Sequence, residues 1–134
     1  MQAVDTNLLV RYITQDGREA AAVSRHLERE CTRECPGFVC QIVLCELVWV
    51  LRHAYKYDRS TVAGILEKLL STVEFEIECA DVAWRALAEY REGPADFADY
   101  LIGQVAGVYD AIPVHTLDQK AAKNAHFVRV DVNP

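Results

Sequence analysis

The sequence of 134 residues has no long hydrophobic run. No stretch approaches the roughly 20 apolar residues that a helix needs to cross a bilayer. The opening MQAVDTNLLV also has no basic start followed by a long apolar segment, which is the pattern of a secretory leader. We therefore expect a soluble cytoplasmic protein that is not inserted in a membrane.

The cysteines include no CxxC pair, and their number, five, is odd. This pattern favours reduced thiols in a reducing compartment over a disulfide framework. A zinc site built from Cys31, Cys35, Cys40 and Cys45 is the weaker alternative, because the spacing matches no common zinc finger.

An excess of positive charge is also lacking. The chain carries 14 lysines and arginines against 20 aspartates and glutamates, a formal net charge of -6. Nucleic-acid binding usually depends on basic residues that neutralise phosphates, so this balance argues against it. Clustered acids that recruit divalent cations would change that conclusion, because bound ions reverse the local sign of charge.

Composition and length predict one folded domain. Hydrophobic residues make up 51% of the chain and charged residues 25%, which excludes disorder. A chain of this length can bury a hydrophobic core without disulfides. With no repeat or linker in view, we expect a single domain over residues 1–134.

Strand and helix patterns alternate along the chain. Short apolar or alternating segments predict strands at residues 2–5, 38–40, 73–78, 112–118 and 126–131. Helical spacing of apolar residues predicts helices at residues 6–14, 18–31, 41–55, 61–71, 81–92 and 95–110, with a short helix at 119–124. This alternation predicts a three-layer α/β/α fold around a central, mainly parallel sheet.

Four aspartates occupy positions that suit a binding site. Asp5 and Asp118 each end a predicted strand, and ligands of parallel sheets bind beyond the carboxyl ends of the strands. Asp96 and Asp99 lie three residues apart at the start of one predicted helix, so they share a face.

Glu46 lies inside the apolar segment QIVLCELVWVL. Its neighbours predict a mostly buried side chain, and an ionised carboxylate there is costly unless something pairs with it. No lysine or arginine follows until Arg52. Acids that converge without basic partners raise one another's pKa values, so a cation should occupy the cluster. Magnesium or manganese suits carboxylate ligands best.

Each acid also has a simpler interpretation. Asp5 and Asp96 could cap the helices that follow them. Asp118 could merely close a turn, and Glu46 could reach solvent. The prediction of a metal site therefore depends on the joint placement of these residues.

Other polar residues are candidates for supporting roles. Thr6, Asn7 and Thr116 flank the acids and could hold them by hydrogen bonds, although turn formation explains them equally well. The cations nearest the acids in sequence are Arg11, Arg52 and Lys120. They could bind substrate phosphates, and solvated surface charge is the alternative for each.

Two histidines and two tryptophans are weaker candidates. His53 and His115 could ligate a metal, but each stands alone in the sequence, and packing or surface positions explain them better. Trp49 and Trp84 fall on apolar helical faces, which predicts core positions rather than platforms for base stacking.

Four segments in this order resemble the PIN-domain family, especially the VapC-type toxins of toxin-antitoxin pairs. They are VDTNLLV, QIVLCELVWVLR, ADFADYLI and TLD, and the resemblance extends over essentially the whole chain. It implies a three-layer fold with a parallel sheet, dependence on Mg or Mn, and endonucleolytic cleavage of RNA. It also implies a homodimer and a small antitoxin partner.

The resemblance assigns Asp5, Glu46, Asp99 and Asp118 to the family's acidic quartet. Asp96 is similar to an extra upstream acid in one branch of the family, whereas Tyr100 stands where a small residue is common. The implied chemistry is hydrolysis of a phosphodiester by metal-activated water.

Two other functions are compatible with parts of this pattern. A PIN-like module could bind RNA or protein with little cleavage, although the intact acid set argues against it. A response-regulator receiver is disfavoured, because receivers have two adjacent acids after the first strand and only Asp5 stands there.

Overall fold

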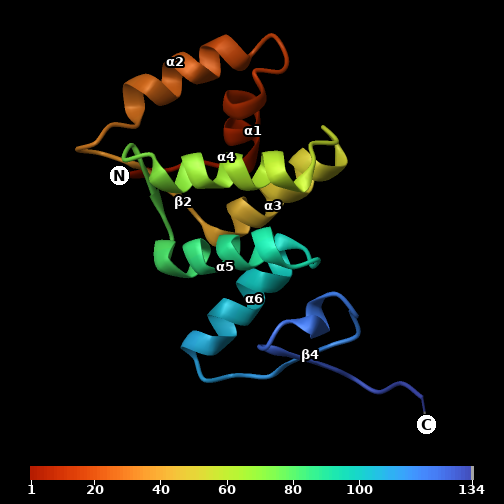
Figure 1. Cartoon of the computed structure of the whole chain (residues 1–134). Helices are drawn as coiled ribbons and strands as arrows, with labels where there is room; N and C mark the ends of the chain where they lie inside the picture. Colours follow the sequence, from red (N-terminus) through yellow and green to blue (C-terminus); the bar gives the residue numbers. More distant parts are fainter. Residues whose placement is uncertain (134) are drawn as a thin grey trace. The chain divides into compact units, whose positions relative to one another are not determined.

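The computed structural model describes residues 1–133, and the chain forms two compact units, Met1–Ala80 and Asp81–Pro134 (Figure 1). Each unit has its own parallel strands and its own buried apolar residues.

The first unit contains a three-stranded parallel sheet in the order β1-β2-β3. Its strands are β1 (Gln2–Ala3), β2 (Gly37–Val39) and β3 (Phe75–Ile77). Residue Gln2 pairs with Gly37, and Phe38 pairs with Glu76. The strand predicted at residues 73–78 forms β3, at one edge of this sheet.

Four helices complete the first unit. They are α1 (Thr6–Thr14), α2 (Ala20–Glu30), α3 (Gln41–His53) and α4 (Arg59–Ser71). Helix α1 contacts α2 and α3, and α4 contacts α3 and β3 (Figure 1). The parallel connection from β2 to β3 therefore passes through two helices, as parallel strands require a long crossover.

Helix α3 supplies much of the core of this unit. Its buried residues repeat at intervals of three and four, which places them on one stripe of the helix. They are Val43, Leu44, Leu47, Val48 and Leu51.

Helix α4 begins at an N-cap formed by Asp58. The Asp58 carboxylate accepts a hydrogen bond from the Thr61 backbone N–H at 2.8 Å, and this bond holds the pKa of Asp58 below its ordinary value.

The second unit contains two helices, a short 3-10 helix and a parallel strand pair. The elements are α5 (Ala80–Glu92), α6 (Phe97–Val108), β4 (Val114–Thr116), η1 (Ala121–Lys123) and β5 (Phe127–Arg129). Val114 pairs with Phe127 and Thr116 with Arg129. Gly103 on α6 allows β5 to approach, because a Cβ there would lie 2.9 Å from the Phe127 ring.

The order and type of the predicted elements are confirmed, as is an α/β fold with parallel strands. Helix α1 has the predicted bounds, β2 is shifted by one residue, α4 and α5 begin one or two residues earlier than expected, and the other elements are shorter at their ends. The single domain over residues 1–134 stays a prediction.

All five cysteines are free thiols. Among residues 1–133, no helix is both long enough and apolar enough to cross a bilayer.

The prediction of core positions for Trp49 and Trp84 is wrong, because both side chains are exposed. Trp49 lies outside the buried stripe of α3 and is 60% exposed. Its ring stacks on His53, with 4.6 Å between the ring centroids.

Candidate active site

The candidate residues divide between the two units. In the first unit, Asp5 follows β1 and caps α1, where its Oδ1 accepts a hydrogen bond from the Leu8 backbone N–H at 3.0 Å. The next residue, Thr6, donates from its hydroxyl to Glu46 Oε1 at 2.7 Å. This bond joins the first residue of α1 to the middle of α3.

The prediction that Glu46 is mostly buried is wrong. Its side chain is exposed and lies on the same side of α3 as Ile42 and Trp49, both of which are also exposed. The apolar residues adjacent to Glu46 in sequence point elsewhere, because successive helical residues are about 100° apart. Arg52 is not its partner either, since the Arg52 guanidinium donates to the Tyr57 carbonyl at 2.9 Å.

In the second unit, two acids stand at the start of α6. Asp96 is the N-cap residue, and its backbone N–H donates to Asp99 Oδ2 at 3.3 Å. This bond fixes the Asp99 carboxylate against the first turn of the helix. A helix N-terminus stabilises negative charge, so the ionised form of both carboxylates is favoured by this position.

Asp118 lies two residues beyond the end of β4. Its Oδ1 accepts hydrogen bonds from the backbone N–H groups of Lys120 at 2.7 Å and Ala121 at 3.1 Å. Its own backbone N–H donates to the Thr116 hydroxyl at 3.0 Å. The Thr116 hydroxyl therefore bonds the backbone at Asp118, whereas the Thr6 hydroxyl bonds the Glu46 carboxylate itself.

The acids of the second unit lie close enough to influence one another. Asp96, Asp118 and Lys120 line one hollow, of about 410 Å³. Burial raises the pKa of Asp99 above its ordinary value, and the nearby charges of Asp118 and Asp96 raise it further. The hydrogen bond from the Asp96 backbone opposes this shift without cancelling it.

Helix capping and metal binding can coexist at these residues. Asp5, Asp99 and Asp118 each use one carboxylate oxygen to accept a backbone N–H, and the other oxygen accepts none from residues 1–133. Hydrogen bonds of this kind orient carboxylates for a metal ion. The donor set, oxygen atoms of carboxylates, fits magnesium or manganese.

No three acidic, histidine or cysteine side chains within the described part of the chain form a group that could hold an ion. The metal site therefore stays a prediction.

The remaining candidates have different surroundings. Asn7 is exposed. Arg11 donates to the Asp16 carbonyl at 3.3 Å, so it and Arg52 both stabilise chain segments next to their own helices. Lys120 lines the acidic hollow, where a cation could meet a phosphate. The His53 ring stacks on the Trp49 ring.

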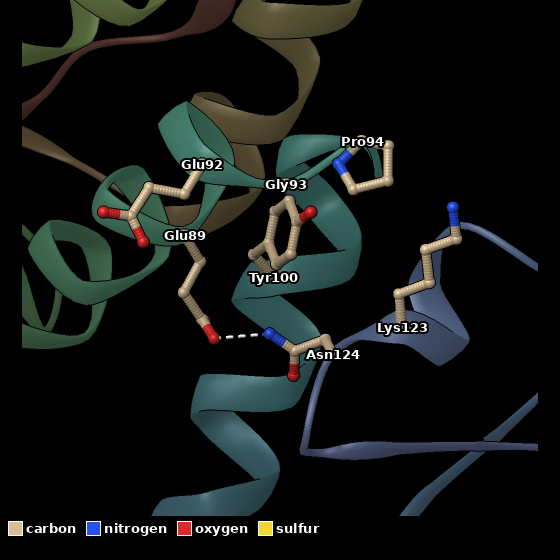
Figure 2. Close-up of a pocket in the computed structure, with 7 residues that line it drawn as sticks. All are labelled: Glu89, Glu92, Gly93, Pro94, Tyr100, Lys123 and Asn124. Atoms are coloured by element: carbon tan, nitrogen blue, oxygen red, sulfur yellow. Dashed lines mark hydrogen bonds between the residues drawn. The ribbon is translucent and has the colours of Figure 1, made fainter.

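Sequence reasoning missed Glu89, a half-buried carboxylate on α5. It accepts hydrogen bonds from the side-chain amides of Asn124 (Figure 2) and of Gln104, the latter at 2.7 Å. The His126 Nδ1 atom lies 3.9 Å from its carboxylate. The signal was present, because Glu89 follows the buried Val82 by seven residues and therefore lies on the apolar stripe of its helix.

Tyr100 lines a second cavity, of about 200 Å³, rather than the acidic hollow (Figure 2). Its ring is buried, and its hydroxyl accepts a hydrogen bond from the Ala95 backbone N–H at 3.0 Å. The large side chain therefore packs under the turn that precedes Asp96.

Two comparisons with known proteins identify the family of this chain. A VapC ribonuclease of Aquifex aeolicus (strain VF5) is 25% identical to this chain over 101 residues, which cover 75% of each protein. The model of the PIN domain family matches residues 3–127 and so spans both units. On that match, the chain belongs to the PIN domain family.

Proposed function

We propose that this protein is a Mg- or Mn-dependent endoribonuclease, the toxin of a type II toxin-antitoxin pair. The family match and the similarity to a VapC ribonuclease support a nuclease. The observation that carries the proposal is the acidic set itself, in which each unit presents carboxylates oriented by backbone or hydroxyl donors.

The proposed metal ligands are Asp5, Glu46, Asp99 and Asp118, with Asp96 as an additional ligand. Asp5 and Glu46 belong to the first unit and the other three acids to the second, and we propose that all of them belong to a single domain over residues 1–134. The family match supports the single domain, because one family model covers residues on both sides of the boundary between the units.

The side chains around the acids would orient them and bind substrate. Thr6 and Thr116 hold the segments that carry Glu46 and Asp118. Lys120, beside Asp118, would bind a phosphate of the RNA. Arg11 and Arg52 are weaker candidates for that role, because both already donate to carbonyl groups. A bound divalent ion would activate water and stabilise the departing oxygen.

We further propose that the protein is a cytoplasmic homodimer that binds a small antitoxin. The homodimer is supported by the fact that most soluble oligomers are symmetric dimers. The antitoxin partner is supported by the resemblance to the toxins of toxin-antitoxin pairs. Light scattering should give the mass of two chains at micromolar concentration. A strict monomer, with and without the partner, would contradict the dimer.

Replacement of Asp5 tests the enzymatic proposal. Asp5→Asn keeps an oxygen that can accept the Leu8 N–H, so the fold should persist, whereas the lost charge weakens metal binding. We expect RNA cleavage only with Mg or Mn, and none from this variant. Asp110→Asn is the control, because Asp110 is exposed and has a left-handed φ of 54°, which asparagine tolerates.

Full activity of the native protein in excess chelator would contradict the proposal. Absence of cleavage by the native protein with every RNA and metal tested, together with RNA binding, would favour the alternative of a PIN-like binding module.

A further inference from the structure

Three segments of the second unit meet at the Glu89 carboxylate. Glu89 belongs to α5, Gln104 belongs to α6, and Asn124 ends the η1 turn. The Asn124 amide (Figure 2) and the Gln104 amide both donate to Glu89, whose side chain is 25% exposed. A half-buried carboxylate with two amide donors fixes all three segments, because breaking either bond leaves a polar group unpaired.

The two amides cannot turn round without losing other bonds. Gln104 Oε1 accepts from Arg85 Nε at 2.9 Å, and Asn124 Oδ1 accepts from the His126 backbone N–H at 2.8 Å. Each amide must therefore present its nitrogen to Glu89. Only a group with two acceptor oxygens satisfies both of them.

Asn124 is joined to Asp118 by a short hydrogen-bonded segment. The Ala122 N–H donates to the Asp118 carbonyl at 3.1 Å, and the Asn124 N–H donates to the Ala121 carbonyl at 3.0 Å. The Asp118 carboxylate accepts from the start of the same segment. A displacement of Asn124 would therefore move Asp118 and Lys120 as well.

We propose that Glu89 is a positioning residue for the proposed metal ligand Asp118. Through Asn124 it holds the Asp118–Asn124 segment, and through Gln104 it holds α6, whose first turn carries Asp96 and Asp99. Glu89 thus sets the spacing between the acids of the second unit. This inference rests on the proposed function.

The test exchanges the chemistry of the Glu89–Asn124 pair. Glu89→Gln can satisfy only one of the two amides, and Asn124→Asp places two carboxylates face to face. The double variant restores every bond. Its new amide at position 89 accepts from Gln104 and donates to the new carboxylate at position 124, whose second oxygen accepts from the His126 N–H. Net charge is also unchanged.

Mn²⁺ affinity of the full-length protein, measured by electron paramagnetic resonance, is the main readout. A residue that orients a metal ligand typically contributes 10- to 100-fold to affinity, so each single variant should bind Mn²⁺ more weakly by roughly that factor. The double variant should recover most of the loss. In metal-free protein, the amide NMR signals of Lys120 and Ala121 should shift in the single variants and return in the double variant.

Glu92→Gln is the matched control. Glu92 is exposed, lies one turn along the same helix and lines the same cavity (Figure 2), and its replacement should change neither readout. The inference would be overturned if both single variants bound Mn²⁺ with native affinity. It would also be overturned if the double variant folded but bound Mn²⁺ no more tightly than the single variants. If Asp118→Asn also binds Mn²⁺ normally, the proposed function itself fails. If Asp118→Asn binds Mn²⁺ more weakly while the Glu89 and Asn124 variants bind it normally, only the role of Glu89 is refuted.

Discussion

At the scale of single residues, the acids of the candidate site combine two tasks. The Asp5 and Asp118 carboxylates satisfy backbone N–H groups at the start of a helix or turn, and Glu46 accepts from a threonine hydroxyl. These bonds hold the carboxylates in place before any ion binds. Asparagine or glutamine can replace such an acceptor while removing the charge, so function and folding can be separated by substitution.

Substitution of Glu46 should separate function from folding most clearly. Because its side chain is exposed and Thr6 can donate equally well to an amide oxygen, Glu46→Gln should change the free energy of unfolding in chelator by no more than about 0.5 kcal/mol. RNA cleavage should nevertheless be lost. Thermal denaturation in chelator and a cleavage assay test both statements. A clearly destabilised variant that still cuts RNA would make Glu46 a scaffold residue.

Asp99 should make stability depend on pH. Its pKa in the folded protein is raised, chiefly by burial, so the folded state disfavours its ionised form. Its contribution to stability is therefore highest below the unfolded pKa of about 4 and falls as pH rises through the raised folded value.

Asp99→Asn lacks this penalty and still offers an oxygen to the Asp96 N–H. Metal-free Asp99→Asn should consequently be more stable than the native protein at pH 7, and the advantage should vanish below about pH 4. Urea denaturation across this pH range measures the difference. A variant that is less stable at pH 7 would show that the carboxylate has a cationic partner instead.

At the scale of elements, the turn between α5 and α6 depends on close packing. Tyr100 lies beneath Gly93, where an added Cβ would overlap the tyrosine hydroxyl oxygen. The same hydroxyl accepts from the Ala95 N–H. Because the ring is buried and its hydroxyl is held by the Ala95 N–H, glycine at position 93 and tyrosine at position 100 fit as a pair.

Gly93→Ala should therefore destabilise the protein by roughly 1–3 kcal/mol, the usual cost of overpacking. Gly64→Ala in α4 is the control, because a Cβ at that position meets nothing within 4 Å. Alanine there should stabilise the helix by about 0.5–1 kcal/mol. Urea denaturation of both variants measures the two effects. Equal stability of Gly93→Ala and the native protein would show that the Tyr100 ring moves freely.

At the scale of the whole molecule, metal binding tests the proposed ligands of each unit. Mn²⁺ at roughly 100 times its dissociation constant should stabilise the native protein by about 2.7 kcal/mol. The resulting thermal shift should be lost in Asp5→Asn, from the first unit, and in Asp118→Asn, from the second. A full shift in Asp5→Asn would show that the second unit binds the ion alone.

The order of the elements and the identity of the acids could be predicted because their signals are local. Helical spacing in QIVLCELVWVL and alternation in VEFEIE are properties of neighbouring residues, and both elements formed as expected. Asp5 at the start of α1 and Asp96 at the start of α6 were likewise visible as residues that precede helices.

The sequence by itself determined an α/β chain with acids at strand and helix ends, since each of these features depends on short-range pattern. Only the tertiary structure decided that Glu46 and Trp49 are exposed, that Glu89 joins three segments, and that Tyr100 packs against Gly93. Each of these facts depends on which face of a helix meets a distant segment. Hydrophobicity along the chain does not specify that partner, because burial and hydrogen bonding of a side chain are set by contacts between residues far apart in sequence.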